Sequence, residues 1–247
     1  MVIDVLDMQP NFNEIYQTYG RWPVALKDYT TMNVTRCLNC PVFAELAAVE
    51  DPLVYLDRFR LRNVPIFAIN AVADEFFIPT GSKFWFQQYP GEAFLHYMPN
   101  AEHSLATAIG RVVNDLSTFA YTVDNDISRP KFSFVVSEDG SAITVKTETP
   151  ARRVRLFQAY NKRSRKFILN CYLTCFWRSS RLLDQGNGTY VGSVEIPTEG
   201  YRAFLIEVEF DIGWTRDFVS STSVSVVPDK FDELPCPDSE CGVCSTC

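Results

Sequence analysis

The sequence predicts an α/β part followed by an all-β part, because its hydrophobic period changes near residue 128. Upstream, apolar runs typical of buried strands alternate with segments of helical spacing, as in parallel sheets joined by crossovers. Downstream, period-two runs separated by turn residues recur over about 100 residues, as in a β-sandwich. We therefore expect an α/β part over 1–127, a β-sandwich over 130–228 and an acidic, Cys-rich tail over 229–247.

The α/β part contains three candidate strands, residues 2–6, 63–72 and 92–98, each a short and nearly continuous apolar run. Such runs are expected for strands that are buried on both faces. Apolar residues with helical spacing predict helices at 42–49, 82–89 and 104–123. Strand, crossover, strand and helix in this order imply neighbouring parallel strands.

The β-rich part begins with a hairpin, in which Asp139-Gly140 separates two alternating runs. The further runs bring the expected total to about seven strands, as in an immunoglobulin- or fibronectin-like sandwich. The expected strands lie within residues 152–160, 166–177, 188–197, 201–210 and 218–227.

Charge and hydropathy exclude several classes of partner. The net charge of −7 argues against a general nucleic-acid or anionic-membrane binder. No apolar run approaches the roughly 20 residues that span a bilayer. We expect no nucleic-acid partner, no membrane span and no cofactor.

Cysteines and glycosylation sequons point to a secreted, extracellular protein. Eight cysteines are many for a cytosolic chain, and Asn33 and Asn187 stand in N-x-T sequons. The first ten residues, "MVIDVLDMQP", lack the basic and apolar regions of a signal peptide. Either the signal lies upstream of Met1 or the compartment is not the secretory one.

The cysteines are interpreted mainly as disulfide partners, although a zinc site or a free, redox-active role stays open. If Cys171 and Cys175 lie in one strand, they are about 13 Å apart and cannot bridge each other. The candidates are Cys37, Cys40, Cys171, Cys175, Cys236, Cys241, Cys244 and Cys247.

Asp74 and His103 each follow a predicted strand, in "NAVADEFFIP" and "PNAEHSL". Parallel strands joined by one crossover present their carboxyl ends at the same sheet edge, so we expect both side chains in adjacent loops. A carboxylate there accepts the imidazole Nδ1–H and leaves Nε2 as a general base. In the alternative interpretation neither residue is catalytic: Asp74 caps the following helix and His103 is a surface loop residue. Glu75 and Glu102 are alternative acids for the contact with the imidazole.

Long segments of the chain, above all "DEFFIP" and "PNAEHSL", closely resemble the PhoPQ-activated pathogenicity-related proteins. The autocrine proliferation repressors of social amoebae belong to the same family. The resemblance implies a secreted α/β-hydrolase with a C-terminal β-sandwich and peptidase-like activity of the dipeptidyl-peptidase kind. It implies Asp74 as the triad acid and His103 as the triad base.

The sequence contains no G-x-S-x-G nucleophile motif. In the family's order the nucleophile precedes the segment that residues 2–6 resemble, so we expect the chain to start just downstream of it. An incompletely predicted gene, a genuine short paralogue and a deliberately shortened chain compete to explain this. Loss of the first strands would leave an exposed sheet edge that favours aggregation or pairing.

Two functions follow. The first is the C-terminal portion of a secreted serine hydrolase that acts on a peptide or ester-like substrate when complete. The second is a non-catalytic extracellular signalling or binding protein, which implies a cell-surface receptor as its partner.

We predict that this polypeptide alone has no serine-hydrolase activity, because the sequence offers an acid and a base without the serine elbow. Incubation with a fluorophosphonate probe for active serines should leave the protein unlabelled. Clear covalent labelling would defeat the prediction.

Overall fold

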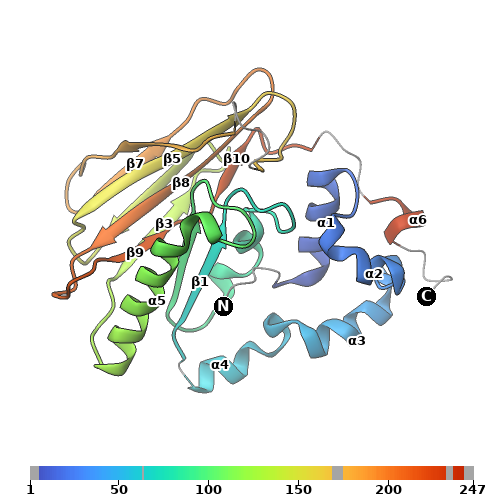
Figure 1. Ribbon diagram of the computed structural model, residues 1–247, viewed down its shortest axis with the longest axis horizontal. Helices are drawn as coiled ribbons and strands as arrows, with labels where there is room; N and C mark the ends of the chain where they lie inside the picture. The colour runs from blue at the N-terminus through green and yellow to red at the C-terminus, as the bar shows by residue number, and fades with distance from the viewer. Residues whose placement is uncertain (1–5, 63, 169–174, 232–235, 242–247) are drawn as a thin grey trace.

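The computed structural model describes residues 6–62, 64–168, 175–231 and 236–241. Figure 1 shows the N-terminal helices at one end of the molecule and the β-rich part at the other, with helix α5 (Ile109–Asp124) below the strands of the β-rich part and beside β1 (Ile66–Ala71). The combination of helices with a mixed sheet and a small antiparallel sheet confirms the coarse prediction of a helical α/β part followed by a β-rich part.

The remaining helical elements, with 3₁₀ helices labelled η, are α1 (Met8–Tyr19), η1 (Val24–Leu26), α2 (Lys27–Thr31), η2 (Thr35–Cys37), α3 (Pro41–Glu50), η3 (Pro52–Tyr55), α4 (Leu56–Arg62), η4 (Gly81–Phe84), η5 (Phe86–Gln88), η6 (Ala106–Ala108) and α6 (Asp238–Cys241). The remaining strands are β2 (Ala93–Met98), β3 (Phe132–Val136), β4 (Ala142–Thr147), β5 (Arg153–Asn161), β6 (Arg178–Arg181), β7 (Thr189–Ser193), β8 (Tyr201–Phe210), β9 (Phe218–Ser221) and β10 (Ser225–Val227).

The N-terminal helices enclose a small core of their own. Phe12 and Ile15 of α1 pack with Phe43 of α3 and with residues of the intervening turns. Gly20 ends α1 in the left-handed conformation, with φ of 66°, a backbone region that glycine enters without a Cβ clash. Pro41 begins α3, where the missing N–H of proline costs no hydrogen bond.

Strands β1 and β2 pair in parallel, with Ile66 opposite Ala93 and Ala71 opposite Met98. The pairing confirms the parallel arrangement expected from the strand, crossover and strand order. It also brings the ends of both strands to one edge, so the loops that follow them start side by side.

Strand β2 also pairs with β9, and this pairing joins the two halves of the chain in one sheet. Leu95 lies opposite Ser221 in antiparallel register. The Ser220 hydroxyl donates to the Leu95 carbonyl at 2.7 Å, and the Ser221 hydroxyl accepts from the Tyr97 N–H at 3.0 Å. The resulting seven-stranded sheet has the order β1-β2-β9-β8-β5-β6, with β10 also paired to β8.

A second, three-stranded sheet of order β3-β4-β7 packs on the antiparallel part of the large sheet. Gly192 of β7 marks a close approach: a Cβ there would lie 3.0 Å from side-chain atoms of Leu156 and Ile206. The hairpin turn predicted at Asp139-Gly140 joins β3 and β4, and Gly140 has φ of 72°.

A buried charge network holds β2, β8 and α5 together. His96 of β2 lies 2.6 Å through Nδ1 from Asp115 of α5 and 3.1 Å through Nε2 from Glu207 of β8. All three side chains are almost completely buried. Arg111 of α5 and Arg155 of β5 are ion-paired with Glu207, so the buried carboxylate is neutralised from both sides.

His96 lies in the middle of β2, where its ring takes part in this network. Arg153 and Arg155 alternate along β5 with buried Val154 and Leu156, and both are ion-paired with carboxylates of the neighbouring strand β8. The partners are distant in sequence, so the strand pattern alone did not indicate them.

Helix α5 packs differently from the amphipathic helix expected at 104–123. Leu105 has φ of 57°, so the α-helix begins only at Ile109, after a 3₁₀ turn. Its buried residues are the polar Asp115, Thr118 and Thr122. Its exposed apolar residues are Ile109, Val113, Leu116 and Val123.

Other sequence expectations were wrong in detail. The helix expected at 82–89 is two short 3₁₀ helices, separated where Trp85 leaves helical geometry with φ of −133° and becomes fully buried. The run 218–227 forms two strands, β9 and β10. Strand β6, with four exposed polar residues, was missed. The strand expected at 2–6 and most of that at 166–177 lie outside the described residues, and the described ends of the latter are not in strand conformation.

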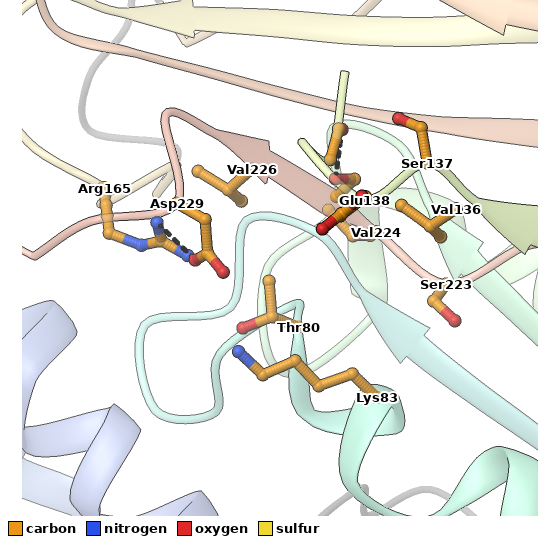
Figure 2. A pocket seen from close by; sticks show the side chains of 12 residues that line it. Thr80, Lys83, Val136, Ser137, Glu138, Arg165, Ser223, Val224, Val226 and Asp229 are labelled. Atoms are coloured by element: carbon orange, nitrogen blue, oxygen red, sulfur yellow. Dashed lines mark hydrogen bonds and ion pairs between the residues drawn. The ribbon is translucent and has the colours of Figure 1, made fainter. Parts of the chain in front are cut away.

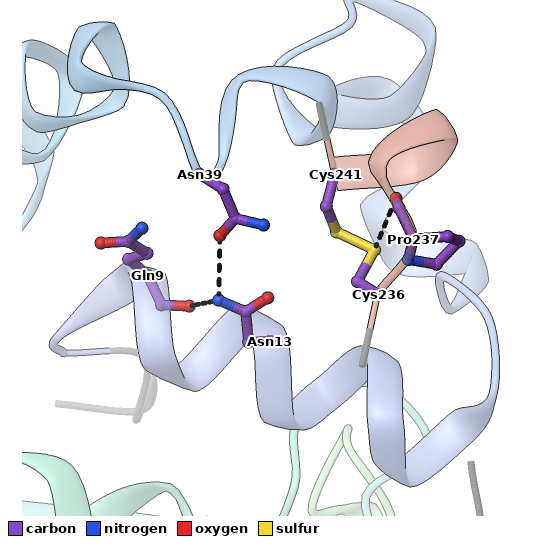
Figure 3. Close-up of a disulfide and its surroundings, with 6 residues drawn as sticks. All are labelled: Gln9, Asn13, Asn39, Cys236, Pro237 and Cys241. Carbon is purple, nitrogen blue, oxygen red and sulfur yellow. Dashed lines mark hydrogen bonds between the residues drawn. A yellow bond between two sulfur atoms is a disulfide. The ribbon is translucent and has the colours of Figure 1, made fainter. Parts of the chain in front are cut away.

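The described part of the C-terminal tail packs on the N-terminal helices. Cys236 and Cys241 form a disulfide and are buried in the core of α1 and α3 (Figure 3). The Asn39 N–H donates to the Cys241 carbonyl at 3.4 Å. Asn39 also accepts a hydrogen bond from Asn13 of α1 at 3.3 Å. These contacts tie the end of the chain to its beginning.

We predict that Glu207→Gln lowers the free energy of unfolding by about 3 kcal/mol, because it removes the buried carboxylate that is paired with His96, Arg111 and Arg155. Glu199→Gln is the matched control, since Glu199 forms an exposed pair with Lys162 and should change stability by less than about 1 kcal/mol. Urea unfolding at pH 6 measures both. A Glu207→Gln effect as small as the control's would contradict a stabilising network.

The same network gives stability a defined pH window. Burial alone would lower the pKa of His96, but Asp115 and Glu207 outweigh it and raise the pKa from 6.5 to about 9. Burial raises the pKa of Glu207, but His96 and the two arginines outweigh it and lower the pKa from 4.5 to about 2. The contribution is therefore fully present between pH 4.5 and 6.5 and declines toward pH 9 and toward pH 2. Stability that rises steadily from pH 6 to pH 9 would contradict this.

A candidate acid–base site beside a cavity

Asp74 lies in the loop that follows β1 and has both carboxylate oxygens engaged. Its Oδ1 accepts the backbone N–H groups of Phe76 and Phe77, at 2.7 and 2.9 Å. Its Oδ2 lies 2.9 Å from Nδ1 of His103. The two N–H donors lie only two and three residues further along the chain. The local turn itself therefore orients the carboxylate toward the histidine.

His103 lies in the loop that follows β2, and aromatic rings set the orientation of its imidazole. The rings of Phe76 and Phe77 lie 4.6 and 5.4 Å from it, centroid to centroid. Because a carboxylate can only accept, the 2.9 Å contact places the imidazole proton on Nδ1. Nε2 then carries the lone pair, and the side chain is 36% exposed.

The structure distinguishes Asp74 from the two alternative acids, Glu75 and Glu102, by the contacts that each one makes. Glu75 accepts the backbone N–H of His103 at 3.3 Å, so it positions the loop and not the ring. Glu102 accepts from the hydroxyls of Ser104 and Thr107 and from the Ala106 N–H. The hydroxyl bonds are the largest of the causes that lower the pKa of Glu102 to about 2. Asp74 is the acid that contacts the imidazole.

Two further contacts hold these loops in place, and the sequence analysis missed both. The Tyr19 hydroxyl of α1 donates to the Asp74 carbonyl at 2.8 Å, and burial raises the pKa of that phenol. Asn100 exchanges two hydrogen bonds with the backbone of Trp177, at 3.0 and 2.8 Å. Trp177 thus anchors the loop that carries His103.

Asp74 is mostly buried, with 9% of its side chain exposed. Burial raises the pKa of the carboxyl group, and the N–H groups of Phe77 and Phe76 and the His103 imidazole offset part of that rise. The hydrogen bonds thus oppose the effect of burial in part, and the pKa of the carboxyl group stays above its ordinary value.

A cavity of about 510 Å³ opens beside this pair. Glu75 and Phe76, both in contact with His103, form part of its wall. The volume is in the range of small-molecule sites. The lining residues come from the end of α1, from the turn after it, from the Asp74 loop and from the segment after β5: Tyr19, Arg21, Trp22, Pro23, Val24, Glu75, Phe76, Lys166 and Ile168.

A second cavity, of about 220 Å³, lies between the Thr80–Lys83 turn and the β3–β4 turn (Figure 2). Its two cations already have partners. Arg165 is ion-paired with Asp229 at 3.3 Å, and Lys83 is ion-paired with Glu14 of α1. Neither Asp74 nor His103 lines this cavity.

The predicted cysteine and sequon positions are partly described. Besides the Cys236–Cys241 bridge, Cys37 and Cys175 are disulfide-bonded, and Cys40 is buried. Cys171, Cys244 and Cys247 lie outside the described residues, so the separation expected between Cys171 and Cys175 is not covered. Asn33 and Asn187 are exposed turn residues with φ of 60° and 53°. Within the described ranges, no three His, Cys, Asp or Glu side chains are grouped to hold a metal ion.

Comparison with known proteins gives a relative of the whole chain. The chain is 31% identical to autocrine proliferation repressor protein A of Dictyostelium discoideum over 268 aligned residues. The alignment covers 98% of this chain and 53% of the relative, so the chain spans about half the length of the curated relative it matches.

The solved structure of a carbohydrate-binding module family 56 β-1,3-glucan binding domain matches 39% of this chain and 96% of its own. The sequence identity is 10% and the TM-score is 0.24, too low to carry an argument. Across the described residues, no helix has the length and apolar composition needed to cross a membrane.

The model of one protein family, described as PhoPQ-activated pathogenicity-related protein, matches residues 1–168. This match includes both strand-end loops and confirms the resemblance of the sequence around Asp74 and His103. The chain therefore belongs to the PhoPQ-activated pathogenicity-related protein family.

Proposed function

We propose that Asp74 and His103 are the acid and the base of a serine-hydrolase-type site that acts on peptide or ester-like substrates. The observation that carries the proposal is the 2.9 Å contact between Asp74 Oδ2 and His103 Nδ1. It joins two loops at the carboxyl ends of neighbouring parallel strands, the edge where α/β sheets place catalytic groups.

In this site the chain's own residues move and hold a proton. Asp74 holds Nδ1–H, so the lone pair of His103 Nε2 takes the proton of a nucleophilic hydroxyl as its oxygen attacks the substrate carbonyl carbon. The imidazolium that forms is stabilised by the Asp74 carboxylate. It then gives the proton to the leaving group as the bond to that group breaks.

The nucleophile in this proposal belongs to the part of the protein that corresponds to the rest of the longer relative. In the same proposal, β1 and β2 are the last strands of an α/β-hydrolase sheet, and β3 to β10 correspond to an immunoglobulin-like sandwich. The order acid before histidine, on consecutive parallel strands, supports this assignment.

We place the protein outside the cell, with glycans on Asn33 and Asn187. Disulfides are typical of secreted proteins, and Cys37, Cys175, Cys236 and Cys241 are all disulfide-bonded. Both sequon asparagines are exposed.

A second candidate is a non-catalytic extracellular signal, supported by the printed name of the Dictyostelium relative, an autocrine proliferation repressor. Its action would require a cell-surface receptor and no chemistry at His103. The ester experiment below separates the two functions, because only the hydrolytic function requires a reactive imidazole.

We predict that this chain slowly hydrolyses 4-nitrophenyl acetate through His103, without any reactive serine. Nε2 attacks the ester carbonyl, 4-nitrophenolate leaves, and water then hydrolyses the acyl-imidazole. His103→Gln should lower the protein-dependent rate at least about tenfold, and Asp74→Asn should lower it several-fold because Nδ1–H loses its carboxylate. Release of 4-nitrophenolate measures the rate.

Glu199→Gln is the matched control, since Glu199 forms an exposed ion pair with Lys162 and does not line the cavity beside His103. Its rate should stay within about twofold of the wild-type rate. If His103→Gln hydrolyses the ester as fast as the wild type, the imidazole is not reactive and the hydrolytic proposal fails.

A further inference from the structure

The 510 Å³ cavity beside His103 has an apolar wall and two cations. Trp22, Pro23, Val24 and Phe76 supply apolar surface. Arg21 and Lys166 supply the positive charges, from segments about 145 positions apart in the chain that the fold brings together. A ligand that fits this cavity therefore needs an apolar body and a negative group.

The two cations, the Arg21 guanidinium and the Lys166 ammonium, form no ion pair within the part of the chain that the structure describes. Other arginines of the molecule do form ion pairs; Arg153, for example, is paired with Glu209 at 2.7 Å. In a chain of net charge −7, two cations in one cavity without an ion-pair partner among the described residues create a local positive potential.

The one carboxylate in the wall does not cancel this potential fully. Glu75 contributes a single negative charge against two positive ones, and its Oε2 is occupied by the His103 N–H. The cavity therefore favours an anion over a cation of the same shape.

Phe76 connects the cavity to the acid–base pair. It lines the cavity, its ring lies 4.6 Å from the imidazole, and its backbone N–H donates to Asp74. Phe76 is thus shared by the cavity wall and the surroundings of the imidazole.

We propose that this cavity binds an apolar residue bearing a free carboxylate, as at the C-terminal end of a peptide, with Arg21 and Lys166 holding the carboxylate. The proposal deepens the hydrolytic function and rests on it for the statement that the bound group belongs to a substrate. Arg21 and Lys166 are then the residues that determine specificity.

The test compares three probes that share one apolar body and differ in charge. N-acetyl-phenylalanine carries a carboxylate, its amide is neutral, and phenylalanine amide is a cation. Isothermal titration calorimetry on the full chain at low salt, where charge effects are least screened, should show the carboxylate probe binding at least about tenfold more tightly than either of the others.

Charge-removing variants connect the preference to the cavity. The double variant Arg21→Gln/Lys166→Gln should lose the tenfold preference. Arg216→Gln is the matched control, because it removes a positive charge from an exposed residue that does not line the cavity, and it should keep the preference. Val24→Asp, at a wall residue that is 79% exposed, should weaken the carboxylate probe without disturbing the fold.

The proposal is overturned if the amide or the cation binds as tightly as the carboxylate. It is also overturned if no probe binds up to about 10 mM, or if the double variant keeps the preference. His103→Gln should bind all three probes as the wild type does, because His103 does not line the cavity. Loss of ester hydrolysis and loss of carboxylate preference are therefore independent, and each can fail without the other.

Discussion

The pairing of β2 with β9, together with the buried charges across it, is the constraint on which the rest of the structure depends. The hydroxyls of Ser220 and Ser221 fix the strands to each other through backbone bonds. His96 joins β2 to α5 through Asp115 and to β8 through Glu207. Burial of a carboxylate or a charged imidazole costs free energy unless each has a partner. The network therefore favours the arrangement in which α5 packs on the sheet with Asp115 next to His96.

Aromatic packing strengthens the same junction. Phe218 of β9 stacks on Phe67 of β1, with ring centroids 5.6 Å apart, and meets Phe94 of β2 edge-on at 4.9 Å. Phe119 of α5 closes the cluster at 5.5 Å from Phe67. The strands that carry the Asp74 and His103 loops are therefore held by the β-rich half of the chain, and the geometry of the acid–base pair depends on that half.

Much of this arrangement could be predicted from the sequence, and the limit has a physical cause. The parallel pair β1 and β2 and the strand-end positions of Asp74 and His103 follow from local patterns, because strand periodicity and order along the chain determine which ends meet. The sequence could not decide whether Asp74 or Glu75 contacts the imidazole. The two residues are neighbours in one loop, and the direction of each side chain depends on the conformation of the turn.

Contacts between distant residues left no local signal. Asn100 and Trp177 are far apart in the sequence, and so are Arg21 and Lys166. Only the three-dimensional fold brings the members of each pair together. Strand β6, "RSSR", has no apolar residue and exists because β5 offers it an edge. The hydrophobic period of α5 indicated a helix but not the face that is buried. The buried face is polar, and Asp115 on that face belongs to the charge network.

The most direct test of the central claim, that Asp74 and His103 form an acid–base pair, is the protonation pattern of the His103 ring. The chain has only two histidines, so ¹⁵N-histidine labelling with two-bond ¹H–¹⁵N correlation spectra resolves both, and His103→Gln assigns them. In its neutral form the His103 ring should show a protonated Nδ1 and an unprotonated Nε2, and Asp74→Asn should abolish this preference. A proton on Nε2 of His103, or a pattern that Asp74→Asn leaves unchanged, would contradict the account.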